Sequence, residues 1–256
     1  MIESSSNAQI KKIQKLKKTA KYRREEGLFV VEGWKMTEEA LSRQLVKNLY
    51  VAAEAKEKFK ERLKSVPYEV LSDKLFRELS DTVTPQGILA VVQMPYYDKE
   101  ILMSSEEAAL LCLEDIQDPG NLGTMVRTAE GAGMAGIVLS KGCVDLFNPK
   151  VVRSTMGALF RVPFYICDDF AEELEQMKKN GFTLYAAHLK GTCDYTEVDY
   201  KGRTAILIGN EANGLTEETS ELAQKLVKIP MEGQLESLNA AVSAALLMYE
   251  VHRNRE

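Results

Sequence analysis

The sequence predicts an α/β protein with a mostly parallel sheet, preceded by a smaller α/β unit. Short apolar runs recur through the second half of the chain, and helical stretches lie between most of them, which is typical of a parallel sheet covered on both faces. Three of the polar, glycine-bearing segments lie at the ends of such runs. Because ligands bind such sheets at the carboxyl ends of the strands, these three loops are the candidate site.

The first part of the chain, to about residue 94, alternates strands and helices. After the capping candidates Ser4 to Asn7, apolar residues at helical spacing between lysines predict a short basic amphipathic helix. We expect strands at residues 27–33, 46–51, 66–70 and 87–93, and helices at 34–42, 53–64 and 73–79. Residues 94–107 break the periodicity and are the linker candidate. The predicted domains are therefore residues 1–100 and 101–256.

The second part carries more strand-like runs and ends in a long helix. We expect strands at residues 110–113, 137–139, 162–166, 183–187, 205–208 and 226–229, and helices at 122–131, 151–157, 170–179, 217–224 and 240–253. The last helix has a continuous apolar face, made of Ala241, Val242, Ala245, Leu246 and Tyr249.

Composition excludes several classes of protein. The 256 residues are 45% hydrophobic, without an apolar run long enough to span a membrane and without a signal-peptide pattern, so we expect a cytoplasmic protein with no membrane partner. The four cysteines have no CxxC spacing, and there are only two histidines. We therefore expect buried, reduced thiols and no metal site. The cysteines are Cys112, Cys143, Cys167 and Cys193.

Positive charge is concentrated at the N-terminus. Residues 1–24 hold eight Lys and Arg against Glu3, a charge of +7, so the remainder carries -12 of the total of -5. This asymmetry favours a nucleic acid as partner, although a solvated helix face would give the same pattern. The candidate RNA-binding residues are Lys11, Lys12, Lys15, Lys18, Arg23 and Arg24.

The sequence GAGMAG at residues 131–136 matches the glycine pattern of dinucleotide-binding turns. That pattern must follow a strand and open a helix, whereas here it ends a predicted helix and leads into a strand. We interpret Gly131, Gly133 and Gly136 as a helix end and tight turn, which argues against a nicotinamide-dependent oxidoreductase.

Two of the three loops offer groups suited to a phosphate or a ribose. In DPGNLGTMVR, Asn121 lies near a helix start and Arg127 nearly two turns on, and a guanidinium is suited to bind phosphate. In AILIGNEANGL, Glu211 follows a strand end, where a carboxylate could orient an arginine or bind a hydroxyl. The structural alternatives are a helix cap for Asn121, a surface salt bridge for Arg127 and a helix-stabilising carboxylate for Glu211.

The third loop, IPMEGQLESLN, precedes the last helix. Ser237 is a natural N-cap, so a capping role is the alternative to a function for it. Asn239 lies next to the start of the same helix.

Together, in this order, the loops resemble those of the SpoU family of RNA 2'-O-ribose methyltransferases, a branch of the SPOUT class. The matching segments are NLGTMVRTAEGAG, LIGNEANGL and IPMEGQLESLNAAVSAALLMYE. The resemblance implies a parallel sheet with a C-terminal trefoil knot and a ribosomal-protein-like α/β domain for RNA at the N-terminus. It also implies a homodimer that buries the last helix and the first motif helix against the partner. Strand order alone would have predicted an ordinary doubly wound sheet, because knots are essentially absent from proteins.

The resemblance also implies S-adenosylmethionine as cofactor and assigns the site. The residues that match the catalytic and substrate-positioning set are Asn121, Arg127, Glu211, Ser237 and Asn239. The cofactor-binding candidates are Ala187, His188, Gly191, Gly209, Asn210, Ile229, Met231 and Leu238. Within this set, His188 has the alternative of a partly buried residue at a strand end.

The expected reaction is attack of a ribose 2'-hydroxyl on the sulfonium methyl group, which forms a C–O bond, breaks the C–S bond and gives a 2'-O-methyl nucleotide and S-adenosylhomocysteine. Because guanidinium is a poor base, we expect Arg127 to hold a phosphate and stabilise the developing alkoxide. Ribosomal RNA is the favoured substrate, since family members with this N-terminal module more often act there. The alternatives are a tRNA 2'-O-methyltransferase and a non-catalytic RNA-binding protein.

Overall fold

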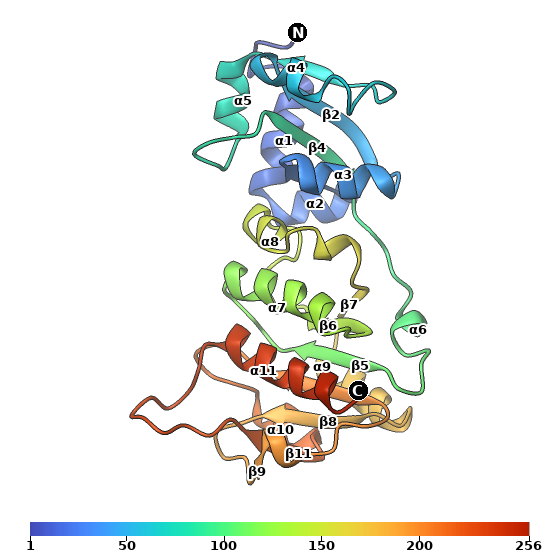
Figure 1. Ribbon diagram of the computed structural model, residues 1–256, viewed down its shortest axis with the longest axis vertical. Helices are drawn as coiled ribbons and strands as arrows, with labels where there is room; N and C mark the ends of the chain where they lie inside the picture. The colour runs from blue at the N-terminus through green and yellow to red at the C-terminus, as the bar shows by residue number, and fades with distance from the viewer. Residues whose placement is uncertain (256) are drawn as a thin grey trace. The chain divides into compact units, whose positions relative to one another are not determined.

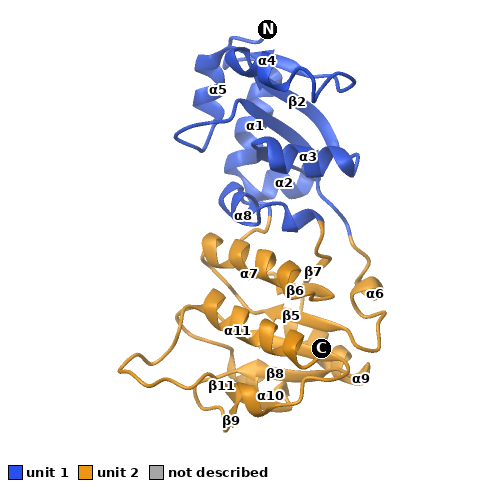
Figure 2. Ribbon diagram, viewed as in Figure 1, with its two compact units in different colours: residues 1–96, 147–160 blue, residues 97–146, 161–256 orange. Residues whose placement is uncertain are grey.

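A computed structural model describes residues 1–255, which form two compact units (Figure 2). The first unit contains residues 1–96 together with residues 147–160, and the second contains residues 97–146 and the chain from residue 161 onward. The sequence-predicted boundary near residue 100 lies close to the first crossing between units. The return of residues 147–160 to the first unit has no counterpart in the sequence prediction.

The first unit is a four-stranded sheet with helices, in the order β1-β4-β2-β3 (Figure 1). Strand β4 pairs antiparallel with β1 and β2, and β2 pairs parallel with β3. Its elements are α1 (Ala8–Lys18), α2 (Ala20–Glu26), β1 (Leu28–Glu32), α3 (Trp34–Ser42), β2 (Val46–Ala52), η1 (Ala53–Ala55), α4 (Lys56–Phe59), β3 (Glu69–Leu71), α5 (Asp73–Leu79) and β4 (Ile88–Gln93), joined by α8 (Pro149–Ser154) and η2 (Ala158–Phe160).

Local signals explain where these helices begin and end. The Asn7 side chain accepts a hydrogen bond from the Gln9 N–H and starts α1, whose Ile10, Ile13 and Leu16 are fully buried. Helix α2 ends at Gly27, whose φ of 63° is the left-handed conformation that glycine adopts without strain. Of the α1 lysines, Lys11, Lys15 and Lys18 are exposed, whereas Lys17 is largely buried and pairs with Asp81.

The second unit is a seven-stranded sheet in the order β7-β6-β5-β10-β8-β11-β9, and every pairing in it is parallel. Strands β5 and β10, at its centre, are buried along their whole length. Its elements are α6 (Lys99–Leu102), β5 (Ala109–Leu113), α7 (Pro119–Gly131), β6 (Gly136–Ser140), β7 (Phe164–Cys167), α9 (Phe170–Lys179), β8 (Thr183–Ala187), β9 (Cys193–Asp194), η3 (Tyr195–Glu197), β10 (Thr204–Ile208), α10 (Glu217–Leu222), β11 (Lys225–Lys228) and α11 (Ala240–Arg253).

The predicted α/β class with a parallel sheet is confirmed, with local differences. Helices at 73–79, 170–179 and 240–253 have the predicted bounds, whereas the predicted helix at 53–64 is wrong in extent, because α4 ends at Phe59 and turns follow. Within this segment, Lys60 pairs with Glu57, three residues before it, at 3.2 Å. The linker candidate contains α6, whose Leu102 is fully buried in the core of the second unit.

The GAGMAG segment has the predicted structure of a helix end. Helix α7 ends at Gly131, Gly133 has a φ of 69°, and β6 begins at Gly136. A Cβ at Gly136 would lie 3.1 Å from the Pro163 carbonyl oxygen, so close packing accounts for this glycine. None of the helices in residues 1–255 is long and apolar enough to cross a membrane.

Candidate active site

Three loops of the second unit are joined by a chain of side-chain hydrogen bonds. The Asn239 Nδ2 donates to Asn121 Oδ1 at 2.9 Å, and the Asn121 Nδ2 donates to Glu211 Oε1 at 2.9 Å. These residues come from three segments that are up to 118 positions apart in the sequence. The structure thus places together three of the five candidate catalytic residues, and the roles assigned to them stay predictions.

Glu211 is the acceptor on which this network converges. The backbone N–H groups of Gln117 and Asp118 each donate to its carboxylate at 3.0 Å, in addition to Asn121. Burial raises the pKa of Glu211, but the hydrogen bonds from Asn121, Gln117 and Asp118 outweigh it and hold the pKa below the usual value. Glu211 is therefore a carboxylate at neutral pH and links the β10 loop to the start of α7.

The helix caps differ from those predicted. Asp118 is the N-cap of α7, accepting from the Asn121 N–H at 2.8 Å, so Asn121 is free of the capping role and uses its side chain in the network. Asn239 is the N-cap of α11, and its Oδ1 accepts from the N–H groups of Ala241 and Val242. The capping alternative for Ser237 is wrong, because the helix begins two residues later than a Ser237 cap requires.

The β10 loop closes tightly on itself. Backbone hydrogen bonds join Asn210 and Gly214 in both directions, at 3.0 and 2.8 Å. The Asn210 side chain donates to the Asp115 carbonyl and accepts from the N–H groups of Ala212 and Asn213. A Cβ at Gly209 would lie 2.2 Å from the backbone of Gly214 and Leu215, so only glycine fits there.

A cleft of about 850 Å3 opens beside this loop, and its volume is within the range of small-molecule sites. Apolar side chains and exposed backbone make up much of its wall, which suits the adenine and ribose of S-adenosylmethionine. Of the eight cofactor candidates, seven line it: Ala187, His188, Gly209, Asn210, Ile229, Met231 and Leu238. The sequence reasoning missed other lining residues, among them Leu189, whose side chain is exposed, and Lys228.

Gly191, the eighth cofactor candidate, does not line the cleft. A Cβ at Gly191 would lie 2.7 Å from the Val227 carbonyl carbon and 2.8 Å from the Lys228 nitrogen, so this glycine lets the turn after β8 approach β11. The same turn is closed by a hydrogen bond from the Lys190 N–H to His188 Nδ1, at 3.0 Å. Gly191 therefore supports the wall that His188 forms.

The side chains of Arg127 and Ser237 are exposed, and neither has a bonding partner within residues 1–255. Within residues 1–255, Arg127 on α7 has no hydrogen bond or ion pair, so the alternative of a surface salt bridge is wrong. Ser237 lines the cleft and likewise has no hydrogen-bond partner in that part of the chain. Both side chains are free to contact a ligand. No group of three potential metal ligands of the Asp, Glu, His and Cys types gathers among these residues.

Among the RNA-binding candidates, the prediction for Arg23 is wrong. Arg23 is only 3% exposed, and its Nη1 donates to the carbonyl oxygens of Leu16 and Lys17 at 2.6 and 3.1 Å. These carbonyl groups lie in the last turn of α1, where they have no partner within the helix. A guanidinium held in this way does not reach a phosphate. Of the others, Lys12 pairs with Glu26, and Lys15 lies 3.9 Å from the centre of the Tyr22 ring. Lys11, Lys18 and Arg24 are exposed.

Glu114, which the sequence reasoning missed, anchors the far end of the β10 loop. This buried carboxylate follows β5 and accepts from the Thr216 N–H at 2.8 Å, the Thr216 hydroxyl at 2.8 Å and the Thr219 hydroxyl at 2.7 Å. An acidic residue directly after a buried strand, at the sheet edge where the loops gather, was the signal for it. It fixes the start of α10 relative to β5.

Replacing Glu114 with alanine should weaken S-adenosylmethionine binding and lower the unfolding temperature, because the buried Thr219 hydroxyl and the part-buried N–H and hydroxyl of Thr216 lose their acceptor. A buried donor left without an acceptor costs about 1 to 3 kcal/mol. Glu114→Gln should retain most of both properties, since hydroxyl groups can accept from the new amide while its oxygen accepts from Thr216. Calorimetric titration and thermal unfolding measure the two effects. Equal damage in both variants would show that the charge, rather than the hydrogen bonds, matters.

Comparison with known proteins identifies the family to which the chain belongs. Residues 108–249 match the SpoU rRNA Methylase family, and residues 7–90 match the MRM3-like substrate binding domain. A Bacillus subtilis relative, the 23S rRNA (guanosine(2553)-2'-O)-methyltransferase RlmP, is 35% identical and covers 98% of both chains. The chain therefore belongs to the SpoU rRNA methylase family.

Solved structures of related methyltransferases superpose on this chain along nearly its whole length. The SpoU methyltransferase AviRb from Streptomyces viridochromogenes, in complex with AdoMet, superposes with a TM-score of 0.89 at 30% identity, covering 97% of this chain and 98% of that one. An AdoMet-bound rRNA methyltransferase from Sinorhizobium meliloti gives a TM-score of 0.86 at 30% identity, covering 98% and 97%. The predicted family, and S-adenosylmethionine as its cofactor, are confirmed.

Proposed function

We propose that this protein transfers a methyl group from S-adenosylmethionine to a ribose 2'-hydroxyl of ribosomal RNA. The observation that carries the proposal is the hydrogen-bonded chain Asn239–Asn121–Glu211 beside a cleft of cofactor size. Family membership supports the reaction, and a 23S rRNA 2'-O-methyltransferase among the relatives supports ribosomal RNA over tRNA. Because a relative acts on 23S rRNA, we propose the cytoplasm as the location of this protein.

In this mechanism the protein positions the two reactants and helps the ribose 2'-hydroxyl to lose its proton. S-adenosylmethionine supplies an electrophilic methyl group when bound. The β10 and β11 loops hold it through their backbone, and the Asn121–Glu211–Asn239 network fixes the α7 start against them. Arg127 holds the substrate phosphate and stabilises negative charge on the 2'-oxygen, while the proton leaves to phosphate or water, because a guanidinium does not accept it.

The proposal is tested by transfer of a labelled methyl group from S-adenosylmethionine to ribosomal RNA. An unmodified 23S rRNA transcript and an unmodified tRNA transcript are compared under the same conditions. Label in the rRNA alone is the expected result. Label in the tRNA alone would mean that the substrate is tRNA rather than ribosomal RNA. Cofactor binding without transfer to either transcript would favour a non-catalytic RNA-binding protein.

We further propose a homodimer formed through α11. This helix buries Ala241, Ala244 and Leu247 in its own chain, yet Val242 and Tyr249 are 48% and 51% exposed. With Ala245 and Leu246 between them, they leave an apolar face on the side away from the core. A second copy of the chain would cover this face.

Val242→Glu should therefore convert a dimer into a monomer without unfolding it, since this side chain is half exposed in the single chain. Light scattering coupled to size-exclusion chromatography measures the mass, and circular dichroism checks the fold. Val242→Thr is the control that keeps the shape of the side chain. A wild-type protein that is monomeric at micromolar concentration would contradict the proposal.

The trefoil knot is a third proposal. Strand β10 enters the sheet between β5 and β8, which are formed by earlier parts of the chain. Helix α11 then packs against α7 (Figure 1). This order of elements supports threading of the C-terminal segment through an earlier loop. Stretching single molecules by their termini should give a contour length shorter than that of an unknotted chain, whereas the full length would contradict the knot.

A further inference from the structure

Residues 147–160 connect β6 to β7 of the second unit in sequence, but fold with the first unit (Figure 2). Aromatic contacts hold them there. The Phe29 ring of β1 lies 4.9 Å from that of Phe147 and 6.0 Å from that of Phe160, at the two ends of the segment. Between them, Val151 and Val152 of α8 are buried. The segment is therefore a fixed part of the first unit rather than a loose loop.

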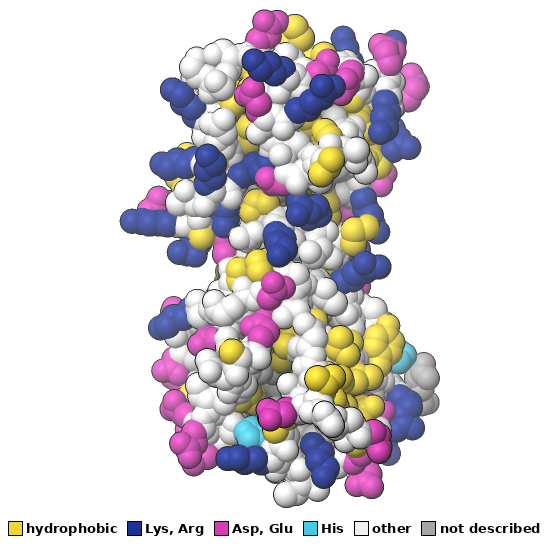
Figure 3. Space-filling model, turned by 90° about the vertical axis from the view of Figure 1, so that its left-hand side faces the viewer, with side chains coloured by type: hydrophobic (Ala, Val, Ile, Leu, Met, Phe, Trp, Pro, Cys, Tyr) yellow, Lys and Arg dark blue, Asp and Glu magenta, His cyan; other side chains and the backbone are white. Residues whose placement is uncertain are grey.

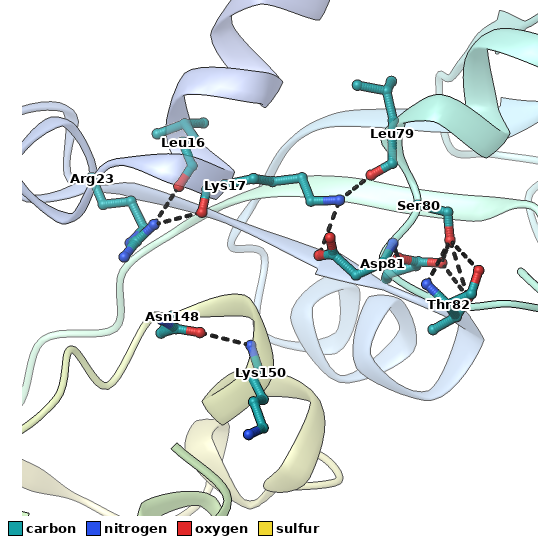
Figure 4. Close-up of polar contacts among 10 residues, drawn as sticks. Leu16, Lys17, Arg23, Leu79, Ser80, Asp81, Thr82, Asn148 and Lys150 are labelled. Atoms are coloured by element: carbon teal, nitrogen blue, oxygen red, sulfur yellow. Dashed lines mark hydrogen bonds and ion pairs between the residues drawn. The ribbon is translucent and has the colours of Figure 1, made fainter. Parts of the chain in front are cut away.

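Hydrogen bonds within the segment set the direction of α8. The Asn148 side chain accepts from the Lys150 N–H at 2.9 Å and caps the helix (Figure 4). The buried Thr155 hydroxyl donates to the Val152 carbonyl at 2.7 Å. Met156 and Gly157, with φ of 53° and 97°, then end the helix in left-handed conformations. With both ends fixed, the exposed side of α8 presents its side chains in a defined place.

That exposed side carries two cations without partners. Lys150 and Arg153 are exposed, and within residues 1–255 neither forms an ion pair or donates a side-chain hydrogen bond. Residues 147–160 contain no Asp or Glu. We call Lys150 and Arg153 the α8 basic pair.

The acidic groups nearest this place in the first unit are already engaged. Arg153 borders a small cavity together with Lys17, Glu32 and Asp81. Asp81 pairs with Lys17 Nζ at 3.0 Å, as Figure 4 shows. Glu32 accepts from the Thr82 hydroxyl at 2.8 Å and the Asp81 N–H at 3.0 Å, and also from the Ser80 hydroxyl. No carboxylate of the described chain lies within ion-pair distance of the α8 basic pair.

The charge of the chain is divided between the two units. The first unit holds 20 Lys and Arg against 13 Asp and Glu, a charge of +7, and leaves 13 against 25, or -12, for the rest. In Figure 3, Lys and Arg are frequent over the first unit, whereas the second shows many Asp and Glu side chains beside an apolar area. The α8 basic pair thus lies in the part of the sequence that matches the SpoU family, but adds its positive charge to the first unit.

We propose that the α8 basic pair binds backbone phosphates of the RNA substrate. This inference rests on the proposed function and adds to it a phosphate-binding surface outside the cleft and outside the basic N-terminal helices. Because the backbone of α8 is already fixed, binding a phosphate requires no ordering of the helix, and the positive unit that carries the pair attracts RNA. The pair fixes the position of the RNA without reading its sequence.

The test is the salt dependence of RNA binding by Lys150→Ala/Arg153→Ala in the full-length protein, with an unmodified 23S rRNA transcript as the probe. Loss of two phosphate contacts should lower the slope of log K against log salt by about 1.4 to 1.8. The affinity advantage of the wild type should then shrink about 7- to 12-fold between roughly 50 and 200 mM salt.

The matched control is Lys56→Ala/Lys74→Ala, which removes two exposed, unpaired cations of the same unit from α4 and α5. Its slope should equal that of the wild type. Equal slopes for the α8 variant and the wild type, or equal losses in both double variants, would overturn the proposal. Wild-type protein that fails to bind the transcript would instead count against the proposed function, and cofactor titration checks that both variants are folded.

Discussion

Replacing Arg127 with alanine should lower the rate of methyl transfer by about 100- to 1,000-fold, the usual effect of removing one group that stabilises developing negative charge. Arg127 is exposed on α7, on the helix that begins at the Asn121–Glu211 contact, and has no partner among residues 1–255. Nothing in the single chain therefore depends on its charge. We expect the unfolding temperature and the affinity for S-adenosylmethionine to stay at wild-type values.

Arg127→Lys distinguishes the two roles that a cation could have. A lysine keeps the positive charge but lacks the planar fork that binds two phosphate oxygens at once. If the fork matters, the lysine variant should be much closer to alanine than to wild type in single-turnover transfer rates. Near-normal turnover would contradict a two-point phosphate contact, and loss of cofactor binding in the alanine variant would contradict a role confined to the substrate.

Replacing Gly209 with alanine should abolish measurable binding of S-adenosylmethionine. The added Cβ would lie 2.2 Å from backbone atoms of Gly214 and Leu215, so the β10 loop cannot keep its conformation. The displaced loop also carries Glu211, the acceptor for Asn121 and for two backbone N–H groups. A shift of about 1 Å at such a site costs on the order of 100-fold in activity, and the loss of the cleft wall adds to it.

Gly233→Ala is the matched control for this prediction. Gly233 lies in the loop between β11 and α11, and a Cβ there would meet no atom within 4 Å. The control should bind cofactor like the wild type in calorimetric titration. Retained binding by Gly209→Ala would show that the β10 loop is not part of the cofactor site, and an equal loss in both variants would show that the effect is not specific to close packing.

The strand periodicity and the polar loop ends were enough to predict much of this site. Buried runs such as residues 205–208 become the central strand β10, and its carboxyl end brings Glu211 beside the start of α7. Asn239 is brought to the same place by the start of α11. These relations follow from the parallel order of the strands, which sequence patterns express directly.

Features that depend on long-range packing were not predictable. The return of residues 147–160 to the first unit depends on the contacts of Phe29 with two distant rings, which leave no local signal. Arg23 resembles its exposed neighbours in sequence, yet it turns inward to satisfy the carbonyl groups at the end of α1. The position of Glu114 directly after a buried strand was a signal for a site residue, but its burial against the Thr219 hydroxyl, 105 positions away, could not be predicted.

The position of the transferred methyl group tests the central claim most directly. Ribosomal RNA labelled by the wild-type protein and S-adenosylmethionine would be hydrolysed in alkali, which cleaves RNA through its free 2'-hydroxyl groups. Our account predicts that the label remains in an alkali-resistant dinucleotide and that Arg127→Ala gives none. Label released in mononucleotides would place the methyl group on a base and contradict ribose 2'-O-methylation.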